Sequence, residues 1–167
     1  MVAKLKSLHC QGFKILIFTN QGNIGTELKG KRAIEVRAYI DAFVAELGIP
    51  VLVLMATQRD HYRKPRVGMW EYLEQNANGD ALIDRTKSFY VGDASGGPGE
   101  HSADDSDFAE AAAVKFFHAH DYFGPPDPAG GNMVEIDKGK GEPGESVLCK
   151  KRGDRACGTS SDKVKKA

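Results

Sequence analysis

Apolar residues along the first 123 positions alternate between two spacings, which predicts strands and helices taking turns. Short apolar runs with β-branched and aromatic residues are typical of buried strands. We expect four such strands, at residues 14–19, 51–56, 88–91 and 114–117. Each run is followed by a turn-rich or polar segment, so each strand is expected to be short.

Three stretches between these runs carry the spacing of helices. In residues 31–47 the apolar side chains recur every three or four positions, on one helical face, and Gly48 and Pro50 end the pattern. Further helices are expected from Pro65 to about residue 76 and over residues 108–113. Strands that alternate with helices through short links form crossover units, so the fold class predicted is α/β with a Rossmann-like parallel sheet.

The composition changes at Gly124, where glycine, proline, serine and charged residues begin to dominate. Such a segment has too few apolar side chains to offset the entropy of ordering. We therefore expect one ordered domain over residues 1–123 and a disordered tail over residues 124–167, with 133–136 and 146–148 as short apolar segments.

Composition narrows the class of protein only slightly. The chain has 23 basic and 23 acidic side chains, so its overall charge gives no evidence for a nucleic-acid partner. The longest apolar runs are far shorter than the roughly 18 residues of a membrane helix, so no membrane association is expected. Three cysteines without a CxxC pair favour a reducing, intracellular compartment.

Polar residues of three chemical kinds follow the predicted strands. Thr19 and Asn20 end the first strand, Lys64 lies in the loop after the second, and Asp93 follows the third. The carboxyl ends of parallel strands meet at one edge of a sheet, where ligands bind. A hydroxyl, a lysine and a carboxylate at one edge suit phosphate binding with a divalent metal ion. Taken singly, each is typical of turn chemistry, a solvated lysine or a helix cap.

Two other motifs are weaker. Residues 25–31 imitate a nucleotide-binding P-loop, but Arg32 stands where a metal-binding serine or threonine belongs, and no strand closely precedes the motif. His118, His120 and Asp121 could bind a metal ion, yet the neighbouring aromatic residues favour a packed chain end.

Longer strings around these residues resemble one family. The segments GFKILIFTNQGNIG, YRKP followed by GMW, FYVGDASGGPGEHSADDSDFA and VKFFHAHDYF are similar to the 3′-phosphatase domain of the polynucleotide kinase/phosphatase family, within the haloacid-dehalogenase superfamily. The resemblance covers roughly residues 5–123. It implies a haloacid-dehalogenase type of sheet and the Mg²⁺-dependent removal of 3′-phosphates from DNA ends in strand-break repair.

The resemblance also implies roles for residues of this chain. Thr19 would hydrogen-bond the transferring phosphoryl group, Lys64 would offset negative charge, and Asp93 would ligate Mg²⁺. Asp105 is a possible second metal ligand, although Asp104 offers another register. The candidate substrate-binding residues are Asn20, Arg63 and Arg66. The expected partners are DNA with 3′-phosphate ends and possibly repair proteins, and the expected location is the nucleus.

The chain departs from the family pattern before Thr19. Residues 1–18 contain no aspartate or glutamate, so the family's aspartate nucleophile, its acid/base aspartate and the central strand that carries them are not found there. Gly97 also replaces a usual arginine. We expect unpaired edges on the neighbouring strands and no phosphatase activity from this polypeptide. The alternatives are a non-catalytic remnant that binds DNA ends or repair proteins, and a small-molecule phosphatase of the same superfamily.

Overall fold

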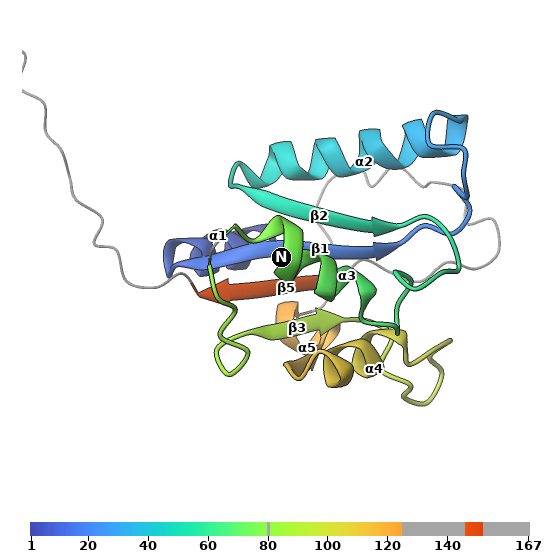
Figure 1. The fold of residues 1–167 in the computed structure, drawn as a ribbon. Helices are drawn as coiled ribbons and strands as arrows, with labels where there is room; N and C mark the ends of the chain where they lie inside the picture. The colour runs from blue at the N-terminus through green and yellow to red at the C-terminus, as the bar shows by residue number, and fades with distance from the viewer. Residues whose placement is uncertain (80, 125–145, 152–167) are drawn as a thin grey trace, which may run out of the picture.

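The computed structural model describes residues 1–79, 81–124 and 146–151 of the 167-residue chain. They form a mixed α/β fold, a sheet with helices on both faces (Figure 1). The strands are β1 (Phe13–Asn20), β2 (Val51–Ala56), β3 (Phe89–Gly92), β4 (Lys115–His118) and β5 (Ser146–Lys151). The helical elements are α1 (Val2–Cys10), α2 (Lys31–Leu47), α3 (Gly68–Tyr72), which continues as a π-type turn over Leu73–Ala77, α4 (Asp104–Ala111) and α5 (Ala119–Phe123).

The five strands lie in the order β2-β1-β5-β3-β4. β1 pairs with β2 and β3 with β4 in parallel, whereas β5 runs antiparallel between β1 and β3. The carboxyl ends of the four parallel strands therefore point to one edge of the sheet, to which the arrows of β1, β2 and β3 lead in Figure 1, whereas the arrow of β5 points the opposite way. This edge brings the segments after β1, β2 and β3 together.

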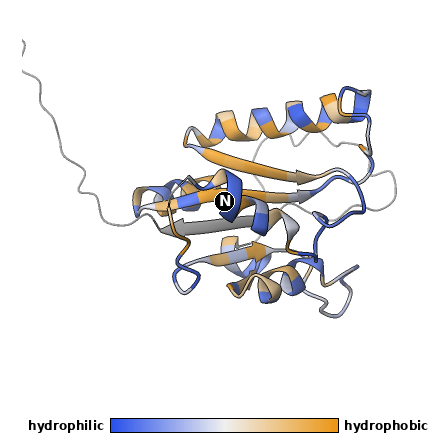
Figure 2. Cartoon of the chain, in the orientation of Figure 1, coloured by the Kyte–Doolittle hydropathy of each residue, from blue (hydrophilic) through white to orange (hydrophobic). Residues whose placement is uncertain are grey.

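Side chains of β1 alternate between two cores because successive strand residues face opposite sides of a sheet. Leu16 and Phe18 pack with α3 and α4, while Ile15 and Ile17 pack with α1 and the end of α2. Figure 2 shows β2 hydrophobic along its length and α2 alternating between hydrophobic and hydrophilic residues. A strand covered on both faces and a helix covered on one face require these two patterns.

The first two predicted strands and the long helix are confirmed: β2 and α2 have the expected bounds, and β1 extends the expected strand by one residue at each end. The third and fourth strands lie one residue later than expected. The predicted helix at 108–113 begins earlier, at Asp104, because its first turn is polar and the apolar spacing could not reveal it. The helices α1 and α5 were not predicted, since α1 has only Leu5 and Leu8 buried and α5 has no buried residue.

The predicted gap in the sheet is not found. The structure places β5 between β1 and β3, where it pairs with both, so the expectation of unpaired edges on these two strands is wrong. Within the expected tail, residues 146–151 form β5, which includes the short apolar segment expected at 146–148; residues 125–145 and 152–167 lie outside the described part. The apolar character of this segment did not reveal that it pairs with a strand on each side.

Among the residues that the structure describes, no helix combines the length and the apolar character needed to cross a membrane.

We predict that Leu148→Pro destabilises the fold. Residue 148 lies opposite Leu16 of β1 and Tyr90 of β3, and proline removes the backbone donor that an interior strand uses. The buried group left unpaired costs about 2 kcal/mol, which lowers the melting temperature by roughly 4–8 °C. Thermal unfolding followed by circular dichroism checks this. Leu148→Ile, which keeps the donor, is the control, and equal melting of both variants would show that β5 contributes nothing to the sheet.

Candidate functional site

Lys64 directs its ammonium group into the protein. Its side chain is only 1% exposed, and Nζ lies 2.7 Å from Oδ1 of Asp105, also 1% exposed. Nζ also donates to the carbonyl of Phe18 at 3.2 Å and to the hydroxyl of Tyr90 at 3.3 Å. Breaking a buried pair at one side leaves an uncompensated charge, so these two residues depend on each other for their stability.

Asp105 joins the lysine to the segment after β3. Its Oδ1 accepts from Lys64 and from the hydroxyl of Tyr90 at 3.1 Å, and its Oδ2 accepts from the backbone N–H groups of Asp93 and Ala94 at 3.1 and 3.2 Å. Gly92 has no side chain to obstruct this approach, since a Cβ there would collide with the Asp105 carboxylate. Both carboxylate oxygens thus already have protein donors, which does not support the expected role of Asp105 as a metal ligand.

Asn20 holds the loop that carries the lysine. Its Oδ1 accepts from the backbone N–H of Lys64 at 3.0 Å, and its Nδ2 donates to the Lys64 carbonyl at 3.2 Å. The Asn20 side chain is fully buried, with both ends of the amide engaged. The structure therefore gives Asn20 a positioning role, and this arrangement does not support the expected contact with substrate.

Thr19 and Asp93 lie at the same edge. Thr19 is buried, and its Oγ1 accepts from Nε2 of Gln21 at 3.1 Å. Asp93 is partly buried, and its Oδ1 has no hydrogen-bond partner. Burial raises the pKa of the Asp93 carboxyl above its usual value, and the negative charge of Asp105 raises it further, against a smaller opposing effect of Lys64. The cationic groups near Asp93 therefore compensate its ionised carboxylate only in part.

Glu100 closes the glycine-rich segment after Asp93, a contact that sequence reasoning missed. Its carboxylate accepts from the backbone N–H and the hydroxyl of Ser95 and lies 2.9 Å from Nε2 of His118. Hydrogen bonds from Ser95, from the Gly97 N–H and from His118 lower the pKa of Glu100 to about 2. No local pattern signalled it, because Glu100 and His118 belong to separate elements.

The remaining candidates lie on the lysine loop and at the end of β4. Arg66 is exposed and donates through Nη1 to the carbonyl of Asp60 at 2.8 Å, and Arg63 is half-buried. His118 lies against Glu100, and His120 lies 3.6 Å from Asp121. Across residues 1–79 and 81–124 and the strand β5, no group of three histidine, cysteine or acidic residues could hold a metal ion.

The fold and this edge define a class: an α/β domain whose parallel strands end beside a threonine, a buried lysine and a carboxylate. The family model of polynucleotide kinase 3 phosphatase matches residues 1–123. The chain belongs to this family, as its sequence motifs led us to expect.

Similar proteins include two that are named as polynucleotide phosphatases. The chain is 41% identical over 135 residues to the polynucleotide 3′-phosphatase ZDP of Arabidopsis thaliana, with 73% of this chain and 19% of the relative covered. It is 33% identical over 123 residues to a bifunctional polynucleotide phosphatase/kinase of Schizosaccharomyces pombe, with 74% and 29% covered. An uncharacterised 20.8 kDa protein of Autographa californica nuclear polyhedrosis virus is 31% identical over 121 residues, with 68% and 63% covered. The chain thus spans about a fifth and under a third of the first two relatives.

We predict strong coupling between Lys64 and Asp105. Lys64→Met and Asp105→Asn each leave one buried group without its charged partner, so each should lower the free energy of unfolding by about 3 kcal/mol or more. The double variant should lose clearly less than the sum of the two. Urea unfolding of the four proteins measures this coupling. Lys31→Met is the control, because Lys31 is 93% exposed and lies 3.9 Å from Glu35, and it should cost under about 0.5 kcal/mol.

We predict that Asp93→Asn stabilises the metal-free protein at pH 7. The pKa of Asp93 is raised in the folded state, so its ionised form opposes folding above that pKa and the opposition ends as the pH falls through it. The advantage of the variant should therefore shrink on acidification, as chemical unfolding at pH 4–7 can show.

Asp84→Asn is the matched control, because the pKa of Asp84 is shifted in the opposite direction to that of Asp93. Hydrogen bonds from Thr86 and Lys87 lower the pKa of Asp84 to about 2. The contribution of Asp84 is therefore present at neutral pH and is lost as the pH falls from about 4 towards 2. Asp84→Asn should be the less stable protein at pH 7, and a gain at that pH would contradict this account of both groups.

Proposed function

We propose that this domain binds the 3′-phosphate of a DNA end, as the substrate site of a polynucleotide 3′-phosphatase. The observation that carries the proposal is the joining of Lys64 and the Asp93 segment through Asp105 at the edge where Thr19 lies. Two similar proteins are named as polynucleotide phosphatases, which supports a polynucleotide as the substrate. The proposal includes a haloacid-dehalogenase type of sheet, a role in strand-break repair and a nuclear location.

Mg²⁺ fits the proposed site through Asp93. The buried Oδ1 of this residue lacks a partner, and the raised pKa reflects an anion that the protein itself leaves poorly compensated. Mg²⁺ commonly takes one or two carboxylates and completes its coordination with water and substrate phosphate, so a large cluster of ligands is not needed. When bound, Mg²⁺ supplies positive charge that stabilises the phosphoryl oxygens.

The described residues would bind and orient the phosphate. The hydroxyl of Thr19, near the end of β1, would donate a hydrogen bond to a phosphoryl oxygen, and the Lys64 ammonium would supply a fixed positive charge at the same edge. Asp105 and Asn20 position Lys64 from its side chain and from its backbone. Arg63 and Arg66 of the same loop would offset the charge of the DNA backbone.

Turnover needs a nucleophile as well. Residues 1–18 of this polypeptide contain no acidic side chain, and the strand between β1 and β3 is β5. Loss of a covalent nucleophile typically lowers the rate by about 10⁴–10⁶. We therefore propose that this polypeptide binds DNA ends without hydrolysing them, and that polynucleotide 3′-phosphatase activity belongs to proteins in which the site is joined to an aspartate nucleophile.

We predict that the 167-residue protein binds a 3′-phosphorylated oligonucleotide at least about ten-fold more tightly than the same strand with a 3′-hydroxyl in Mg²⁺, because the phosphate adds charged contacts. Fluorescence anisotropy measures both affinities. Asp93→Ala should remove the dependence on Mg²⁺, whereas Asp84→Ala should retain it. Equal affinity for the two strands would overturn the proposal.

Two further readouts address the alternatives. Inorganic phosphate release should stay at background with the unmodified protein, and a release that Asp93→Ala abolishes would show that a nucleophile is present. Sugar phosphates should not compete with the oligonucleotide at equal concentration. If sugar phosphates did compete, the small-molecule phosphatase would be favoured. Among the described residues, no contact supports that alternative.

A further inference from the structure

Three aromatic rings lie on the surface near the loop that carries Lys64: His61 and Tyr62 belong to this loop, and Tyr72 ends α3. The side chains of Tyr62 and Tyr72 are 44% and 45% exposed, and His61 is exposed beside them. The ring centroids of Tyr62 and Tyr72 are 6.4 Å apart with the planes at 83°, and those of His61 and Tyr62 are 5.5 Å apart. We call His61, Tyr62 and Tyr72 the aromatic platform.

The platform is fixed in place by its own packing. His61 hydrogen-bonds Oε2 of Glu71 at 2.8 Å, and its ring lies so close to α3 that a Cβ at Gly68 would come within 2.6 Å of it. The backbone N–H of Tyr62 donates to Oδ1 of Asp60 at 2.9 Å. Rings that are held before binding lose little conformational freedom when a ligand stacks on them.

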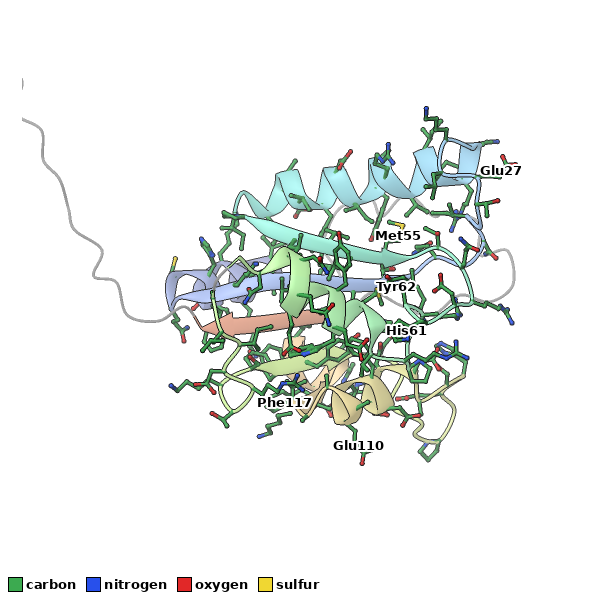
Figure 3. The ribbon with its side chains drawn as sticks, in the orientation of Figure 1. Glu27, Met55, His61, Tyr62, Glu110 and Phe117 are labelled. Atoms are coloured by element: carbon green, nitrogen blue, oxygen red, sulfur yellow. The ribbon has the colours of Figure 1, made fainter. Side chains whose placement is uncertain are left out.

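The platform is continuous with the phosphate site. Tyr62 precedes Lys64 by two residues, and Asn20 fixes the backbone of Lys64 at the end of β1. Figure 3 shows His61 and Tyr62 at the end of the sheet to which β1 and β3 lead. A strand whose 3′-phosphate reached Lys64 would therefore pass its last bases near these rings.

Charge around the rings suits a polyanion. Arg59 and Arg66 are exposed on the same loop, and Arg63, which is half-buried, stands between Tyr62 and Lys64 in the sequence. Asp60 and Glu71 are the nearby acids, but Asp60 accepts from the Tyr62 N–H and through its carbonyl from Arg66, and Glu71 pairs with His61. Cationic groups beside exposed rings are the combination that binds single-stranded nucleic acid, because every base offers a π-face for stacking.

We propose that the aromatic platform stacks the unpaired terminal bases of a DNA strand whose 3′-phosphate occupies the site. This inference rests on the proposed function and adds to it the side chains that would hold the terminal bases. Stacking does not depend on base identity, so the platform would recognise strand ends of any sequence.

The experiment uses the full 167-residue protein and four oligonucleotides of twelve nucleotides. Two are oligothymidines that end in a 3′-phosphate or a 3′-hydroxyl, and two are abasic strands with the same two ends. Anisotropy in Mg²⁺ should show that removing the bases weakens binding by about five-fold or more for either end. The comparison of the two ends reports on the phosphate site, so failure of the proposed function and failure of the platform are distinguishable.

Variants locate the effect. Tyr62→Ala and Tyr72→Ala should each weaken binding of the oligothymidines by about five-fold or more and leave the abasic strands unaffected, whereas Tyr62→Phe should retain the affinity. Tyr39→Ala is the matched control, because Tyr39 is a 37% exposed tyrosine on α2. Equal binding of base-containing and abasic strands by the unmodified protein would overturn the platform. An equal loss of affinity with Tyr39→Ala would also overturn it.

Discussion

The buried ion pair of Lys64 and Asp105 is the interaction on which the site depends. It joins the loop after β2 to the first turn of α4, and through the Asp105 carboxylate it reaches the backbone of Asp93. A pair with 1% exposure on both sides contributes little net stability, because its desolvation offsets its attraction. Its effect is on arrangement: neither partner can leave without stranding a charge, so the loop, β3 and α4 keep one relative position.

A second constraint is the position between β1 and β3. The two cores include residues of both strands, Leu16 with Tyr90 on one face and Ile15 with Phe89 on the other, so the strand that joins them is covered on both faces. In this chain β5 takes that position in the antiparallel sense. The same position governs chemistry, because a strand there lies beside the ends of β1 and β3. The β5 backbone pairs with both strands.

Local pattern was sufficient for much of the fold. The spacing of apolar residues gave β2 and α2 their bounds, because burial on two faces or on one leaves different periods in the sequence. The strand pattern also predicted that Thr19, Lys64 and Asp93 lie at one edge, because the carboxyl ends of parallel strands share an edge. It missed α1, which buries only two residues, and β5, whose short apolar run was diluted by the composition of the residues around it.

The sequence by itself determined the family, the kinds of groups at the site and the absence of acidic residues before Thr19, because these are properties of residue identity and order. Only the tertiary structure decided what each group does. Asn20 and Asp105 read equally well as ligands of substrate or metal, and the structure turns them into supports for Lys64. It alone placed Tyr72 against Tyr62. The contacts of Lys64 with Asn20 and Asp105 join residues far apart in the chain, and such contacts do not produce a periodic pattern in either segment.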